Sequence, residues 1–204
     1  MRSILLLSLL GLPGARAGII NSWSLPPGLG SVSVFNSPGN SNNDNIGGAS
    51  PNLLSGNLNF AAMTAGILTP VGSSTGGTTE YNAVFNIVNN TGQAWGGLLF
   101  EIYVGSTLQT GNGFDFDFPD FDSPVSTTPL WSLNLQNAGQ LLFQGPALPS
   151  GQSVSVTFNL DYPDLLGVPT NMRITPLASV PEPAAWSAMA MGLGLLACCL
   201  RKRG

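Results

Sequence analysis

Apolar and polar residues alternate with a period of two through most of the middle of the chain. The clearest run is Ser153–Leu160, where valine, phenylalanine and leucine alternate with serine, threonine and asparagine. Similar runs cover Asn57–Phe60, Tyr81–Ile87, Leu98–Val104 and Leu130–Leu135. A period of two puts successive side chains on opposite faces of a strand, whereas a helix needs a period near 3.6. These runs therefore predict β-strands.

The connections between the runs are rich in glycine, proline and asparagine, which favour turns. About eight or nine short alternating runs lie between residues 18 and 179, and this pattern is typical of an all-β domain. We expect an antiparallel β-sandwich, immunoglobulin-like or jelly-roll-like, over residues 18–179.

The turn-rich segment Asn89–Gly97, NNTGQAWGG, separates two of the predicted strands. It predicts either an antiparallel hairpin or a crossing from one sheet to the other. Its tryptophan, Trp95, is expected to fill the core between sheets, and a platform that stacks on sugars is the alternative.

The first 17 residues, MRSILLLSLLGLPGARA, have the three parts of a secretory signal peptide. Arg2 is the positive end, Ile4–Leu12 is the apolar stretch, and Ala15 and Ala17 form an A-x-A cleavage site. We expect export through the Sec machinery and cleavage by signal peptidase after Ala17.

The last 25 residues also consist of three blocks, which begin with Pro181, Glu182 and Pro183. Residues 184–200 follow without a charge, and 17 residues of helix extend roughly 26 Å, enough to cross a thin bilayer. Arg201, Lys202 and Arg203 come next and would stay on the cytoplasmic side as a stop-transfer signal. A transmembrane helix is therefore expected over 184–200.

These three blocks together resemble the PEP-CTERM sorting signal of Gram-negative bacteria over residues 180–204. The resemblance implies that exosortase, a membrane protease-transpeptidase, recognises Pro181, Glu182 and Pro183 and releases or transfers the upstream domain. It also implies a setting of exopolysaccharide or biofilm production. An ordinary tail anchor with a chance Pro-Glu-Pro is the alternative.

The net charge of −4 hides a strong asymmetry, because five of the six basic residues lie in the two end segments. Residues 18–180 contain one arginine, Arg173, and nine acidic residues, so their net charge is 1 − 9 = −8. Such a domain repels phosphate backbones, and we therefore expect no nucleic-acid partner.

Four of the acidic residues lie in one unusual stretch, 114–122, FDFDFPDFD. Asp115, Asp117, Asp120 and Asp122 offer the oxygen ligands that calcium prefers, so a calcium site is one hypothesis. The stretch lacks the glycine and final glutamate of an EF-hand. The alternative, which we favour, is an edge strand whose outward charges prevent edge-to-edge pairing.

The residue types available limit catalysis severely. The chain has no histidine, and both cysteines and the single lysine lie in the C-terminal 25 residues. Nucleophile–base pairs and His/Cys metal sites therefore cannot form in 18–179. A glycoside hydrolase could use two of Glu80, Glu101, Asp161 and Asp164, but Glu101 and Asp161 adjoin strand faces where charges are normally solvated.

We therefore expect a protein that is not an enzyme, is anchored in the inner membrane as a precursor and then reaches the cell surface or extracellular matrix. A structural or interaction role, sorted by exosortase, is the first hypothesis. A carbohydrate- or calcium-binding module that uses 115–122 and exposed tryptophans is the alternative, and a carboxylate-dependent glycoside hydrolase ranks below both.

Overall fold

The computed structural model describes residues 18–43, 50–74, 77–117, 121, 126–164 and 167–179. The predicted signal peptide 1–17 and the predicted sorting signal 180–204, with its transmembrane helix, lie outside the described residues. Within the described residues no helix is long and apolar enough to cross a membrane.

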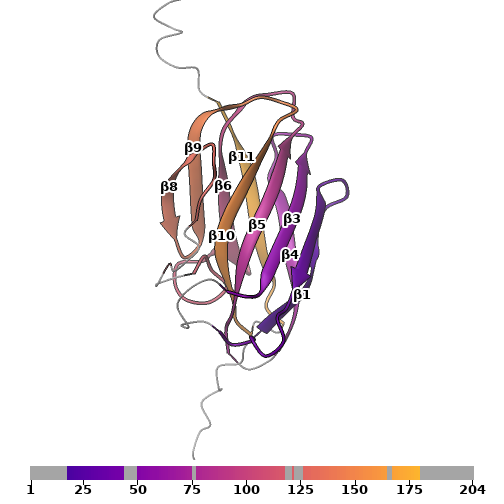
Figure 1. Cartoon of the computed structure of the whole chain (residues 1–204), viewed down its shortest axis with the longest axis vertical. Coiled ribbons are helices and arrows are strands. Elements are labelled where there is room, and N and C mark those ends of the chain that lie inside the picture. Colours follow the sequence, from indigo (N-terminus) through magenta and orange to yellow (C-terminus); the bar gives the residue numbers. More distant parts are fainter. Residues whose placement is uncertain are drawn as a thin grey trace, which may run out of the picture.

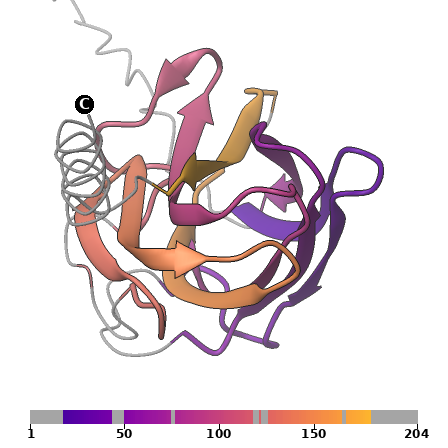
Figure 2. The same cartoon turned by 90° about the horizontal axis from the view of Figure 1, so that it is seen from above.

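All of the regular secondary structure among the described residues is β-strand, which confirms the all-β prediction. One sheet contains, in spatial order, β1 (Gly18–Ser24), β4 (Gly66–Ser74), β11 (Thr170–Ala178), β6 (Trp95–Val104), β9 (Gln140–Leu148) and β8 (Ser132–Asn137), and β7 (Thr107–Leu108) pairs with β6. The other contains β10 (Ser153–Tyr162), β5 (Thr79–Asn89), β3 (Leu53–Phe60) and β2 (Gly30–Phe35). Figure 1 looks onto the four-stranded sheet, and Figure 2 shows the two sheets from above, around a shared interior.

One strand pair departs from the antiparallel prediction. β3 and β5 are parallel, with Leu53 opposite Asn82 and Phe60 opposite Asn89. The chain leaves β3, runs back through β4 in the other sheet and returns to β5 in its original direction. A parallel pair needs such a crossover, and alternation within one strand carries no information about its neighbour's direction.

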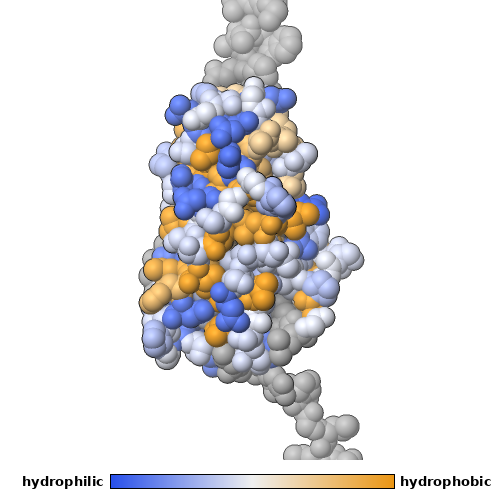
Figure 3. Space-filling view, turned by 90° about the vertical axis from the view of Figure 1, so that its right-hand side faces the viewer, coloured by the Kyte–Doolittle hydropathy of each residue, from blue (hydrophilic) through white to orange (hydrophobic). Residues whose placement is uncertain are grey.

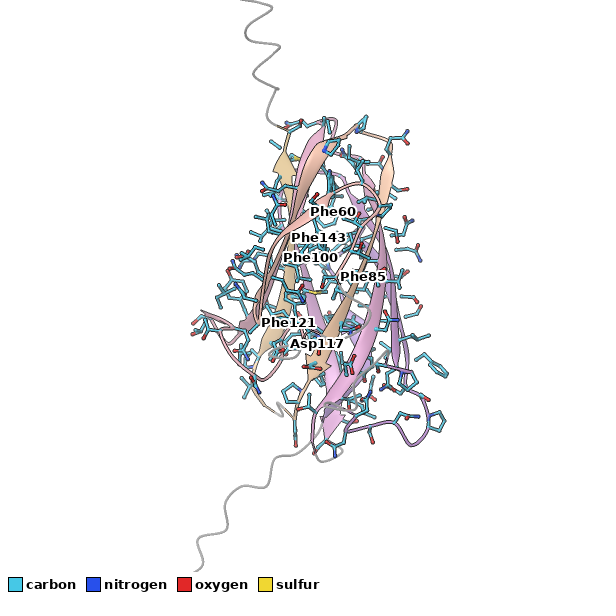
Figure 4. All side chains as sticks on the ribbon, turned by 60° about the vertical axis from the view of Figure 1, so that its left-hand side comes forward. Phe60, Phe85, Phe100, Asp117, Phe121 and Phe143 are labelled. Atoms are coloured by element: carbon cyan, nitrogen blue, oxygen red, sulfur yellow. The ribbon has the colours of Figure 1, made fainter. Side chains whose placement is uncertain are left out.

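The predicted alternation is confirmed in β3, which alternates exposed and buried residues along its whole length. It is wrong for β8, where the register shifts between Leu133 and Leu135 and leaves Leu135 exposed while Trp131 is buried. Inward side chains of both sheets form one core in which aromatic rings meet edge to face. Phe100 of β6 contacts Phe158 of β10 across the sheets, with ring centroids 5.4 Å apart. Figure 4 shows Phe60, Phe85, Phe100 and Phe143 gathered in the interior.

Residues 89–97 carry the chain from one sheet to the other. Of the two predicted alternatives, the crossing between sheets is therefore confirmed and the antiparallel hairpin is wrong. β5 belongs to the four-stranded sheet and β6 to the seven-stranded sheet. Asn89 is buried and its side-chain amide donates to the carbonyls of Gln93 (2.8 Å) and Leu148 (3.0 Å). These bonds hold the turn that carries the chain from one sheet to the other.

Trp95 fills the core at this crossing, as predicted. Its ring is fully buried and meets Phe60 of the opposite sheet at 5.7 Å and 87°. Its indole Nε1 donates to Thr91 Oγ1 at 3.1 Å, which satisfies its polar atom. A buried ring cannot stack on a sugar, so the alternative role for Trp95 is wrong.

Candidate functional site

Most of the residues with a predicted role in sorting lie outside the described part of the chain. These are Ala15, Ala17, Pro181, Glu182, Pro183, Arg201, Lys202 and Arg203, and the calcium candidates Asp120 and Asp122 lie outside it as well. The structure does place Asp115, Asp117 and the four carboxylates considered for glycoside hydrolysis.

The stretch that begins at Phe114 is not an edge strand with outward charges, and this favoured prediction is wrong. Asp115 and Asp117 are only 1% and 4% exposed. Phe114 and Phe116 are fully buried and meet Tyr162 and Phe158, with centroids 5.5 Å apart in each pair. The two phenylalanines enter the core, and this burial takes the intervening carboxylates below the surface as well.

The chain around this stretch covers the open edge of β10. Asp115 and Asp161 exchange backbone hydrogen bonds of 3.3 and 2.9 Å, and Thr127 and Thr157 exchange two bonds of 2.9 Å. An exposed strand edge is a template for pairing with another chain, so this cover protects the four-stranded sheet on that side. The protection comes from backbone pairing and not from charge.

Asp161 and Glu80 lie directly opposite each other in the pairing of β10 with β5. Both are 3% exposed, so the expectation that Asp161 is solvated is wrong. Together with Asp115 and Asp117 they define what we call the acidic end of the domain, where Asp164 also lies. Figure 4 shows Asp117 toward this end, below the labelled core phenylalanines.

A network of amide and hydroxyl groups covers Glu80 from the 36–52 connection. The Glu80 carbonyl accepts from Ser50 Oγ (2.6 Å) and Asn52 Nδ2 (3.1 Å), and the Glu80 amide donates to Asn43 Oδ1 (3.0 Å). Asn43, Ser50 and Asn52 are themselves buried. These bonds satisfy the backbone amide and carbonyl of Glu80 at the start of β5 and attach the 36–52 connection to this strand.

The described residues do not assemble a metal centre. No group of three or more His, Cys, Asp or Glu in this part of the chain is arranged to hold a metal ion. One oxygen of Asp115, Oδ2, accepts a hydrogen bond from the Gly113 amide within the same loop. Because Asp120 and Asp122 lie outside the described residues, the calcium hypothesis stays a prediction.

Of the four carboxylates considered for hydrolysis, Glu80, Asp161 and Asp164 lie at the acidic end and Glu101 lies elsewhere. Glu101 lies on the seven-stranded sheet, where it accepts a 3.4 Å bond from Gln140 Nε2. Asp164 accepts from Ser74 Oγ at 2.6 Å and lines a shallow pocket with Tyr162. Neither Glu80 nor Asp161 lines the pocket beside Asp164, the hollow beside Leu29 and Phe60, or the pocket beside Gly96 and Ser179. A glycosidase needs two carboxylates that face a groove, so the hydrolase hypothesis stays a prediction.

The described tryptophans offer no platform for a carbohydrate. Trp23, Trp95 and Trp131 are all at least nine-tenths buried. Trp131 points its Nε1 at the Pro146 carbonyl (2.7 Å). The predicted use of exposed tryptophans by a binding module is therefore wrong for these three residues, because all three belong to the core.

Tyr81 joins three elements near the acidic end. Its hydroxyl donates to Asn36 Oδ1 (2.6 Å) and accepts from the Ile20 amide of β1 (2.8 Å). Burial raises the pKa of Tyr81 to about 12, and the hydrogen bond from Ile20 only partly opposes this increase. Burial also raises the pKa of Tyr162.

Stability is expected to fall as pH rises from 10 toward 12. The unfolded chain loses the tyrosine proton near pH 10 and the folded chain retains it, so stability is complete below pH 10 and decreases above it. For Tyr81 this amounts to about 2–3 kcal/mol.

Urea denaturation from pH 8 to 12 measures this loss of stability. Tyr81→Phe should be less stable than the wild type at pH 8 but should lose less stability as the pH rises to 12. Tyr103→Phe, a change on the half-exposed outer face, is the control. If Tyr81→Phe and Tyr103→Phe lost the same amount of stability between pH 8 and 12, the alkaline loss would not arise from Tyr81.

No family model, no curated protein and no solved structure matches this chain.

Proposed function

We propose that this protein is an exported, non-enzymatic structural or interaction protein of the cell surface or extracellular matrix. It would be held in the inner membrane by residues 184–200 and processed by exosortase at Pro181, Glu182 and Pro183. Its partners would be signal peptidase and the Sec machinery, then exosortase, and then the surroundings of an exopolysaccharide matrix. The observation that carries the proposal is the order of Pro-Glu-Pro, apolar stretch and basic cluster at one end, with a signal sequence at the other.

The extent of the folded domain supports this proposal. β1 begins at Gly18, directly after the predicted signal cleavage site, and β11 ends at Ala178. The Ser179 amide still donates to the Ala94 carbonyl at 3.0 Å. The Pro-Glu-Pro therefore begins two residues after the last described contact in the sequence, as expected if processing occurs just beyond the folded domain. A sandwich of the immunoglobulin or jelly-roll type would be the delivered unit.

The arrangement of charges also favours an interaction role over catalysis. Glu80 and Asp161 are buried. Glu101 lies on a sheet face opposite Arg173, and Asp164 accepts a bond from Ser74 Oγ beside a shallow pocket. The surface instead presents mixed patches, and Figure 3 shows apolar side chains interrupted by polar ones over the side of the molecule that it displays.

The proposal predicts that Glu182→Ala leaves the unprocessed chain in the inner membrane. Glu182 is the charged member of the recognition motif, and its loss should abolish recognition by exosortase while export and anchoring continue. Intact mass and fractionation of the native protein, from a host with and without its exosortase, measure the outcome.

Ser179→Ala, two residues before the motif, is the matched control and should be processed normally. A wild-type chain that ends near Pro183 or upstream, in the surface or medium fraction and only when exosortase is present, would support the proposal. Normal processing of Glu182→Ala, or a full tail in the membrane of both hosts, would contradict it and leave a plain tail-anchored protein.

A further inference from the structure

The folded domain has two chemically different ends. Four connections meet at the end where the chain leaves toward residue 180: 25–29, 61–65, 90–94 and 149–152. Backbone hydrogen bonds attach them to the ends of neighbouring strands, including Asn90 N to Phe60 O of β3 (2.9 Å) and Gly151 N to Asn89 O of β5 (2.6 Å). The Ser179 amide bonds to the Ala94 carbonyl in one of these connections (3.0 Å). We call these four connections together with Ser179 the exit end.

The exit end contains no ionisable side chain. Its connections read LPPGL, AAMTA, NTGQA and PSGQ. Pro26, Pro27, Ala61, Ala62 and Ala65 are exposed, and they line a shallow apolar hollow above Leu29 and Phe60.

The charge of the described residues is concentrated far from the exit end. Glu80 lies at the start of β5 and Asp161 at the end of β10, and both positions are opposite to the exit end. β10 contains 10 residues and rises about 3.3 Å per residue, so the acidic end lies roughly 30 Å from the exit end. Glu101 and Arg173 face each other at an intermediate level in the β6–β11 pair.

The tether to the predicted membrane segment is short. Only residues 180–183 separate Ser179 from Ala184, where the predicted membrane segment begins. Five extended peptide steps span at most about 18 Å. This is less than the roughly 30 Å between the two ends of β10, so a domain with its acidic end against the membrane would need a longer tether.

We propose that the exit end is a membrane-facing surface, which rests on the phospholipid headgroups while the precursor is anchored. This inference rests on the tail anchor of the proposed function. An uncharged, partly apolar end can approach an anionic headgroup layer, which would repel the carboxylates of the other end. At physiological salt the Debye length is about 8 Å, so carboxylates roughly 30 Å away do not oppose this contact.

A site-specific quenching experiment on the full chain tests the inference. Cys198→Ala and Cys199→Ala remove the native thiols, and a single cysteine is placed at Ala62 on the exit end or at Ser106 in the β6–β7 turn at the opposite end. Both positions are exposed, so neither label should disturb the core. The labelled chain is reconstituted in phosphatidylethanolamine and phosphatidylglycerol vesicles that contain headgroup spin-labelled lipid.

We expect the fluorophore at Ala62 to be quenched several-fold more than the one at Ser106. Equal quenching at both positions, or none at either, in a chain that resists a carbonate wash would overturn the membrane-facing surface and leave the tail anchor intact. A chain that the wash removes from the vesicles would overturn both. Circular dichroism of each labelled chain verifies that the strands are intact.

Discussion

Replacing Phe158 by alanine is expected to lower the free energy of unfolding by about 3–5 kcal/mol, the usual cost of truncating a buried phenylalanine. Phe158 is fully buried and its ring meets Phe85, Phe100 and Phe116 at 5.4, 5.4 and 5.5 Å. These partners belong to its own sheet, to the opposite sheet and to the segment that covers β10. The cavity would therefore weaken the packing of both sheets and of the covering segment at one point.

Equilibrium urea denaturation of the purified chain measures this effect as a shift in the midpoint. Phe35→Ala is the matched control, because Phe35 is 54% exposed at the end of β2 and its truncation removes little buried area. We expect the control to change stability by less than about 1 kcal/mol. Similar losses for the two variants would show that the aromatic cluster does not join the sheets as described.

The second large effect is expected from Asn52→Ala, at about 2–4 kcal/mol, because several buried polar groups lose a partner at once. The Asn52 side chain donates to the carbonyls of Asn40 (2.9 Å) and Glu80 (3.1 Å) and accepts from the Ser37 amide (2.9 Å). It is 1% exposed. Its loss removes one of the two hydrogen bonds to the Glu80 carbonyl and loosens the acidic end.

Asn90→Ala provides the comparison for this variant. Its side-chain amide makes one exposed hydrogen bond, to Asn59 Oδ1 at 2.8 Å, and its loss should cost about 1 kcal/mol or less. Denaturation midpoints of both variants at neutral pH decide the question. An Asn52→Ala variant as stable as Asn90→Ala would mean that water replaces the network without cost.

The two proposals give the two ends of the domain different tasks. The acidic end is held by backbone hydrogen bonds between Asp115 and Asp161 and by the side-chain bonds to the Glu80 backbone. Its buried acidic residues therefore belong to the folded structure and not to an exposed surface. The exit end contains no ionisable side chain, and its last residue, Ser179, lies two residues before Pro181. In the sorted protein, loss of the tail would free the exit end from the membrane for contact with other molecules.

Alternation along the chain was sufficient to locate many of the strands, but no predicted run covers β1 or β7. β3, β5, β6 and β10 follow the predicted runs because burial of one face requires a period of two, and this requirement is local to each strand. The burial of Trp95 was also predicted from local sequence, because a large apolar ring in a turn-rich segment between two strands is expected to enter the core. The predicted processing of both ends likewise rests on local signals.

Pairing between distant segments was decided only by the tertiary structure. The parallel β3–β5 pair depends on the path through β4, which neither strand's own residues record. Asp115, Asp161 and Glu80 meet because β10 pairs with β5 on one side and with the covering segment on the other. A charged residue in an alternating pattern predicts exposure, but exposure is set by what packs above it, and that information lies in residues far away along the chain.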